Sequence, residues 1–163
     1  MFFKKKSLPS LTDLLSESIN KDYERFVGTI FKDETLTSEQ KIETAIYLLF
    51  LYVHVMLIRE LPANISLEFP TNPNVLSVLN DQEKAMLLEK YQERMPIYVE
   101  AFTELDNKML ALTALFLSNF YNIEKNLVVD QKAQQLVQGE MYSMIILKNN
   151  IEIINLCTQH NNL

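Results

Sequence analysis

The stretch AIYLLFLYVHVMLI, residues 45–58, decides the fold of this chain. It carries no formal charge, and Glu43 and Arg59 lie close outside its two ends. As a helix it would span roughly 21 Å, whereas the apolar part of a bilayer is about 30 Å thick and needs about 20 apolar residues. We therefore expect a helix that is buried at the centre of the protein, with no transmembrane segment.

Both ends of this central helix are marked in the sequence. Thr37 followed by Gln40 has the pattern of a capping box, in which each side chain binds a free backbone amide at the start of the helix. Leu61-Pro62 ends the helix, because proline disfavours helical geometry at the residue before it. These signals predict a helix over residues 38–60.

Four further helices are predicted from apolar residues at steps of three and four. Ser10 with Asp13 marks the start of the first, and Asn80 with Glu83 marks the start of the second. Pro96 is expected to break or kink the chain after the second, because one straight helix running through it would be too long for a compact domain. The predicted ranges are 11–31, 81–95, 97–122 and 131–157.

The segments between and beyond these helices are expected to be irregular. Residues 61–74 hold three prolines and form a predicted proline-rich loop, in which Ile65, Leu67 and Phe69 alternate as an extended segment would. A flexible tail is expected over residues 1–9 and a frayed end over 158–163. With two glycines and five prolines in 163 residues, tight turns are few. The fold class predicted is all-α: a single domain, residues 1–163, forming an irregular, mostly antiparallel bundle of about five main helices.

The last two predicted helices carry more apolar residues than one face can hold. In the last helix we expect six residues to face the core: Val137, Met141, Met144, Ile145, Ile151 and Ile154. Further apolar residues fall away from this face, and the helix over 97–122 shows the same excess. Because large exposed apolar patches usually mark interfaces, and two-fold symmetry is the commonest way to cover them, the sequence predicts a homodimer. The alternative is that both helices are central, with the first helix and the proline-rich loop covering them.

Composition excludes several classes of function. Two glycines cannot build a glycine-rich phosphate-binding loop, and neither histidine belongs to a zinc-protease or di-iron motif, so no cofactor is predicted. The single cysteine, Cys157, forms no internal disulfide, and the chain shows no export signal, so we expect a cytoplasmic protein. A formal net charge of -6 argues against nucleic-acid binding.

One group of residues could line a small pocket. Tyr47, Phe50 and His54 share a helix face by their steps of three and four. His54 titrates near neutral pH, so its protonation is sensitive to burial. A neutral histidine hydrogen-bonded within the core is the simpler interpretation; the other is a small-molecule or enzyme site between helices.

A row of carboxylates offers a second surface. Glu89, Glu93, Glu100 and Glu104 are spaced four, seven and four residues apart, which aligns them if one helix continues past Pro96. Such a row could face a basic protein or hold a hard cation, whereas neighbouring Lys90, Arg94 and Lys108 favour an ordinary solvated face.

The N-terminal residues Phe2, Phe3, Lys4, Lys5 and Lys6 could contact an anionic membrane surface weakly, since each lysine contributes only about 1 kcal/mol. This alternative makes the protein a peripheral membrane-associated factor. The leading hypothesis is a small acidic, non-enzymatic interaction protein that binds another protein. Because the chain is acidic, we expect this partner to be basic. An adaptor, a secretion chaperone and a toxin-neutralising immunity protein all fit that description.

Overall fold

The computed structural model describes residues 9–103, 108–160 and 163 and is all-α. Within these residues there are seven α-helices and one 3-10 helix, rather than the five main helices predicted. Five of the seven α-helices are long. The two short ones, α3 and α6, were not predicted because each is at most two turns, too short to show a repeating apolar pattern. The elements are α1 (Leu11–Ile30), α2 (Ser38–Ile58), α3 (Ala63–Ser66), η1 (Phe69–Thr71), α4 (Asp81–Thr103), α5 (Lys108–Tyr121), α6 (Lys125–Gln131) and α7 (Ala133–Gln159).

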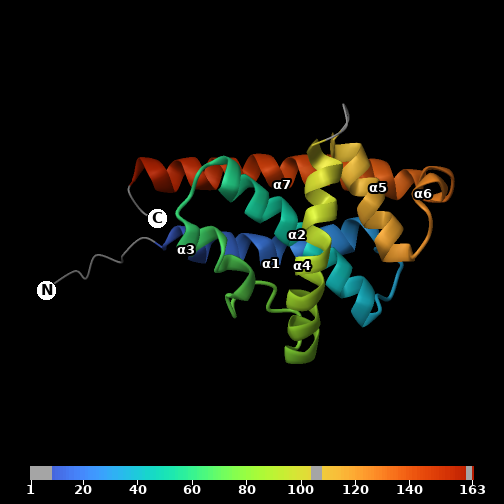
Figure 1. Ribbon diagram of the computed structural model, residues 1–163, viewed down its shortest axis with the longest axis horizontal. Helices are drawn as coiled ribbons and strands as arrows, with labels where there is room; N and C mark the ends of the chain where they lie inside the picture. Colours follow the sequence, from blue (N-terminus) through green and yellow to red (C-terminus); the bar gives the residue numbers. More distant parts are fainter. Residues whose placement is uncertain (1–8, 104–107, 161–162) are drawn as a thin grey trace, which may run out of the picture.

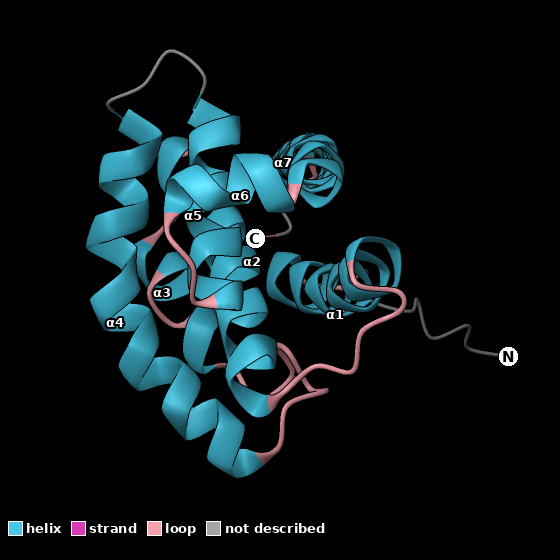
Figure 2. Cartoon of the chain, turned by 90° about the vertical axis from the view of Figure 1, so that its right-hand side faces the viewer, coloured by secondary structure: helices cyan, strands magenta, loops and turns pink. Residues whose placement is uncertain are grey.

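The helices form layers around α2. Helix α4 covers one side of α2, while α1 and α7 lie on the other side, as the two views agree (Figures 1 and 2). Helix α7 runs back antiparallel to α1, so the start of α1 and the end of α7 lie at the same end of the molecule (Figure 1). Helix α5 packs against α2, α4 and α7 and completes the single domain.

The central position predicted for residues 45–58 is confirmed. Every residue from 42 to 53 on α2 is buried, and Met56 is fully buried one turn later. By length and composition alone α2 could cross a membrane, but 78% of its most apolar window is packed inside the fold. Burial of this kind is what a helix that is apolar all round requires, because each of its faces needs another helix.

The three capping signals also form as predicted. Ser10 Oγ accepts from the Asp13 amide at 3.2 Å, and the Asp13 side chain accepts in return from the Ser10 amide. Thr37 and Gln40 repeat the arrangement at the start of α2. At α4, the Asn80 side chain accepts from the Glu83 amide at 2.9 Å, and Glu83 accepts from the Asn80 amide at 3.0 Å. Local pairs of this kind satisfy amides that have no partner within the helix.

Of the break or kink expected at Met95-Pro96, the break is wrong. Helix α4 runs through Pro96 to Thr103, and the chain reverses into α5 only after that residue. Proline removes one helical hydrogen bond but does not end a helix that tertiary contacts hold on both sides. Here Arg94 is ion-paired with Glu43 of α2 before the proline, and Tyr98 is completely buried after it.

The proline-rich loop and the frayed C-terminus also differ from prediction. Residues 61–74 contain α3 and η1 rather than an extended segment, with Pro62 before α3 and Pro70 in the first turn of η1, where proline is tolerated. Ile65 and Phe69 are buried, whereas Leu67 is 70% exposed. Helix α7 continues to Gln159, two residues beyond its predicted end. Residues 1–8 of the predicted N-terminal tail lie outside the described residues.

Candidate interaction surface

The inner face of α7 is built from small and polar residues as well as apolar ones. Gly139 allows close contact with α5: a Cβ atom added to it would lie 2.8 Å from Thr113 Cγ2. Ser143 Oγ lies 2.7 Å from the Tyr47 hydroxyl of α2, to which Thr113 is also hydrogen-bonded at 3.0 Å. The buried residues follow steps of three and four: Leu136, Gly139, Ser143, Ile146, Asn150, Ile154 and Cys157.

The face that the sequence predicted as internal is therefore largely external. Val137, Met141, Met144 and Ile145 are 50–61% exposed, so the prediction for these four is wrong. Ile154 is buried as predicted, and Ile151 and its neighbour Leu147 are partly buried. Part of the reason is steric: α7 approaches α5 too closely at Gly139 for a larger side chain, while Leu136, Ile146 and Ile154 fill other positions of the buried face.

An apolar groove lies beside this exposed face. The end of α4 and the start of α5 cross α7 (Figure 1), and Phe102 and Met109 form one wall of the groove. Met144, Leu147 and Ile151 of α7 form the other wall, and the groove has a volume of about 690 Å³. Its remaining lining residues are charged: Lys108, Glu140, Lys148 and Glu152. We define the α7 surface as Val137, Glu140, Met141, Met144, Leu147, Lys148 and Ile151.

His54 lies behind the wall of this groove. Its ring stacks on Phe50 with centroids 5.4 Å apart and meets the edge of Phe102 at 4.4 Å. Its Nε2 atom is buried without a hydrogen-bond partner in the described part of the chain. Burial lowers the pKa of His54, and the nearby Lys108 ammonium lowers it further, so the ring is neutral at neutral pH.

The three residues of the predicted pocket lie behind the groove and do not line it. Tyr47 is fully buried, bonded to Thr113 and Ser143, and stacked on Phe116 at 4.5 Å. Phe50 is fully buried beside His54. Phe102 belongs to the lining of the α7 groove, whereas Tyr47, Phe50 and His54 do not. Burial raises the pKa of Tyr47 to about 12. The arrangement thus places an aromatic cluster behind the groove.

The predicted carboxylate row is exposed where it is described. Glu89, Glu93 and Glu100 lie on the outer side of α4, and Glu104 lies outside the described residues. Arg94, expected on the same solvated face, instead points inward and pairs with Glu43 of α2, with its Nη2 atom 2.8 Å from Oε1. Within the described residues, no group of three histidine, cysteine, aspartate or glutamate side chains is placed to hold a metal ion.

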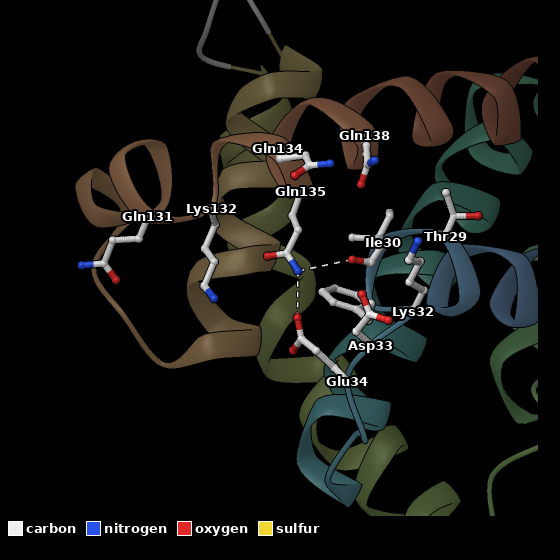
Figure 3. A pocket seen from close by; sticks show the side chains of 11 residues that line it. Thr29, Ile30, Lys32, Asp33, Glu34, Gln131, Lys132, Gln134, Gln135 and Gln138 are labelled. Atoms are coloured by element: carbon white, nitrogen blue, oxygen red, sulfur yellow. Dashed lines mark hydrogen bonds between the residues drawn. The ribbon is translucent and has the colours of Figure 1, made fainter.

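A polar pocket that the sequence did not reveal lies between the end of α1 and the start of α7 (Figure 3). Its volume is about 370 Å³, and four glutamines from the α6–α7 region contribute to it. The Gln135 amide donates to the Ile30 carbonyl at 3.2 Å and to the Glu34 carboxylate at 2.8 Å (Figure 3). Tyr121 also donates to Glu34, and the Lys132 ammonium lies 4.0 Å above the Tyr121 ring. These groups satisfy one another, as in a structural link between α1 and α7.

Asp22 is a buried carboxylate that the sequence did not reveal; it lies on the buried side of α1 between Ile19 and Phe26. It is buried against α2, where the Tyr52 hydroxyl donates a hydrogen bond to the Asp22 Oδ2 atom at 2.5 Å. The same hydroxyl is hydrogen-bonded to Ser18 Oγ at 2.9 Å. Burial raises the pKa of Asp22, although the Tyr52 hydrogen bond and the Arg25 charge oppose that rise. The pair joins α1 to α2 as a buried polar contact whose partners are both satisfied.

Comparison of the chain with models of known protein families, with curated proteins and with solved structures found no match.

Proposed function

We propose that this chain is a non-enzymatic interaction protein whose contact surface is the α7 surface and the groove beside it. The observation that carries the proposal is the exposure of large apolar side chains over two turns of one helix: Val137, Met141 and Met144 are each more than half exposed. Contiguous apolar surface of this kind is uncommon on a protein that acts alone and is typical of a protein interface.

The composition of the surface supports the same proposal. Methionine is enriched at interfaces, and its flexible, polarisable side chain adapts to different partner shapes. Met109, Met141 and Met144 lie at or beside the groove, with Phe102 as a rigid aromatic wall. The charged residues at its edge provide the polar rim that surrounds an apolar interface centre. An adaptor, a secretion chaperone and an immunity protein would each need such a surface.

The outer side of α4 is a second candidate surface, for a basic partner. Glu89, Glu93 and Glu100 are exposed there together with Ile97, which is 43% exposed. Carboxylates around an apolar side chain favour a partner with basic residues around a pocket, mainly through the rate of association.

Site-specific photo-crosslinking in the cell that encodes the chain separates the two surfaces. A photoreactive amino acid at Met141 should give protein adducts, whereas the same group at Glu89 on α4 or at Lys125 on α6 should give few. Met144→Arg should remove the Met141 adducts because it places a charge in the apolar contact. Leu156→Arg, at a site on the same helix that is 54% exposed, is the matched control and should leave the adducts unchanged.

Adducts formed at Glu89 and absent at Met141 would assign binding to α4 and contradict the proposal for the α7 surface. Circular dichroism and thermal unfolding of each variant show whether the fold is retained, and all the substituted side chains named here are exposed or at a groove edge. Adducts that persist unchanged in Met144→Arg would also contradict the proposal.

A further inference from the structure

The α7 surface has an internal symmetry about Met144. Glu140 and Lys148 lie four residues before and after it. Met141 and Leu147 lie three residues to either side, and the outermost pair, Val137 and Ile151, lies seven residues to either side. Residues three, four and seven apart share a helix face. Each of the other six residues that define the surface therefore has a counterpart at the same distance from Met144, apolar matched with apolar and acid matched with base. The neighbouring Ile145, 50% exposed, has none, since Ser143 is buried.

This symmetric pattern indicates which partner binds the α7 surface. We infer that the α7 surface binds a second copy of the chain, with the two α7 helices antiparallel and a two-fold axis passing beside Met144. In that arrangement residues at equal distances before and after Met144 lie at the same height along the helix pair. Glu140 of each copy then faces Lys148 of the other, about 6 Å along the axis on either side of the centre. The inference rests on the proposed role of this surface in binding proteins and names its partner.

Charge complementarity decides between the two ways of pairing the helices. In a parallel pair in register, Glu140 would face Glu140 and Lys148 would face Lys148, and like charges repel. In the antiparallel pair both contacts join opposite charges. Neither Glu140 nor Lys148 forms an ion pair within the described part of its own chain, so both side chains are free to pair across an interface.

The apolar contacts follow the same symmetry. Met144 meets its own counterpart at the centre, Met141 lies level with Leu147, and Val137 lies level with Ile151. Phe102 and Met109 of each copy line the groove into which the other α7 packs. The contact is isologous, since the same patch is used on both copies, which is the usual geometry of a two-fold dimer.

Charge reversal tests the register as well as the association. Glu140→Lys alone places lysine opposite Lys148 twice, and Lys148→Glu alone places glutamate opposite Glu140 twice. We expect each single variant to weaken the dimer by about tenfold or more, because two favourable pairs become two repulsive ones. Glu140→Lys combined with Lys148→Glu in one chain should restore dimerisation, since both contacts again join opposite charges.

Mixing the two single variants gives the sharpest result. A chain carrying Glu140→Lys presents lysine at both positions, and a chain carrying Lys148→Glu presents glutamate at both. Together they should form a heterodimer about as tight as the original dimer, although each alone is weakened. Glu89→Lys makes the same charge change on α4, outside the surface, and should leave dimerisation unchanged. Sedimentation equilibrium over a dilution series gives the dissociation constants, and native mass spectrometry of the mixture identifies the heterodimer.

A mass near 19.0 kDa at every concentration up to 100 μM or so would overturn the inference. So would a dimer that tolerates Glu140→Lys, or a mixture that forms no heterodimer. The proposed function fails separately. If the chain is monomeric but Met141 crosslinks to a different protein and Met144→Arg removes that adduct, the α7 surface binds an unlike partner. The absence of any adduct at Met141 would overturn both the proposed function and the inferred dimer.

Discussion

Helices α2 and α7 are both long and rich in apolar residues, yet they bury them in opposite ways. On α2 every residue from 42 to 53 is buried, including the aromatic rings of Tyr47 and Phe50. On α7 the buried face mixes Leu136, Ile146 and Ile154 with the smaller or polar Gly139, Ser143 and Asn150. Met141 and Met144 are exposed. Helix α2 has neighbours on all sides, whereas α7 has them on one side only and approaches them closely. Burial thus follows the distance between helices as well as hydrophobicity.

The largest expected effect concerns the charged residue that α2 carries into its buried region. Glu43 is 3% exposed and is held by two hydrogen bonds from the Arg94 guanidinium. Arg94→Met leaves this carboxylate buried without its partner and should lower the free energy of unfolding by about 3–5 kcal/mol. Urea denaturation measures the loss. The double variant Glu43→Leu with Arg94→Met should recover most of it, and a loss below about 1 kcal/mol in Arg94→Met would show that the pair is not needed at this helix contact.

The next effect tests whether close packing decides which face of α7 is buried. Gly139→Ala places a methyl group 2.8 Å from Thr113 Cγ2 and should lower the free energy of unfolding by about 1–3 kcal/mol. Gly28→Ala is the matched control, because no atom lies within 4 Å of its added Cβ. It should raise stability by about 0.5–1 kcal/mol through better helix propensity. Equal effects of the two substitutions on the urea midpoint would contradict the close α5–α7 contact.

A third, smaller effect is a gain in stability, expected when the buried Asn150 on α7 is replaced. Asn150 is 1% exposed, and neither polar atom of its side chain has a hydrogen-bond partner among the described residues. Asn150→Leu, which has a similar shape, removes this unsatisfied polar group and should raise the free energy of unfolding by about 1 kcal/mol. Thermal unfolding measures the gain. Destabilisation by Asn150→Leu, in contrast, would mean that the amide has a partner such as a buried water.

The smallest effect is a change in pH dependence at the less buried end of α2. Burial lowers the pKa of His54 below its ordinary value of 6.5, so the unfolded chain binds this proton more tightly than the folded one. Stability should therefore fall as the pH drops below about 6.5, until it reaches the folded-state pKa. His54→Phe should flatten this part of the profile while keeping the ring contacts with Phe50 and Phe102. A His54→Phe profile that matched the wild type would contradict the assignment.

Local patterns were sufficient for much of the fold. The uncharged run 45–58 predicted the central helix because such a run has no face that water can solvate. Ser10, Thr37 and Asn80 marked three helix starts, because a capping side chain and its amide partner are only three residues apart. The end of α4 was missed for a related reason: Pro96 acts locally against the helix, but Glu43 and the packing of Tyr98, contributed by distant segments, hold it together.

The candidate site shows what the sequence by itself determined and what only the tertiary structure decided. The amino-acid sequence determined that α7 has more apolar side chains than one helix face can bury, and it fixed the symmetric spacing of Glu140, Met144 and Lys148. It did not determine which face turns inward. That choice depends on how closely α2 and α5 approach α7, and hence on contacts of Gly139 and Ser143 with residues far away in the chain. Because the small side chains permit the closest approach, the methionines are left on the outside.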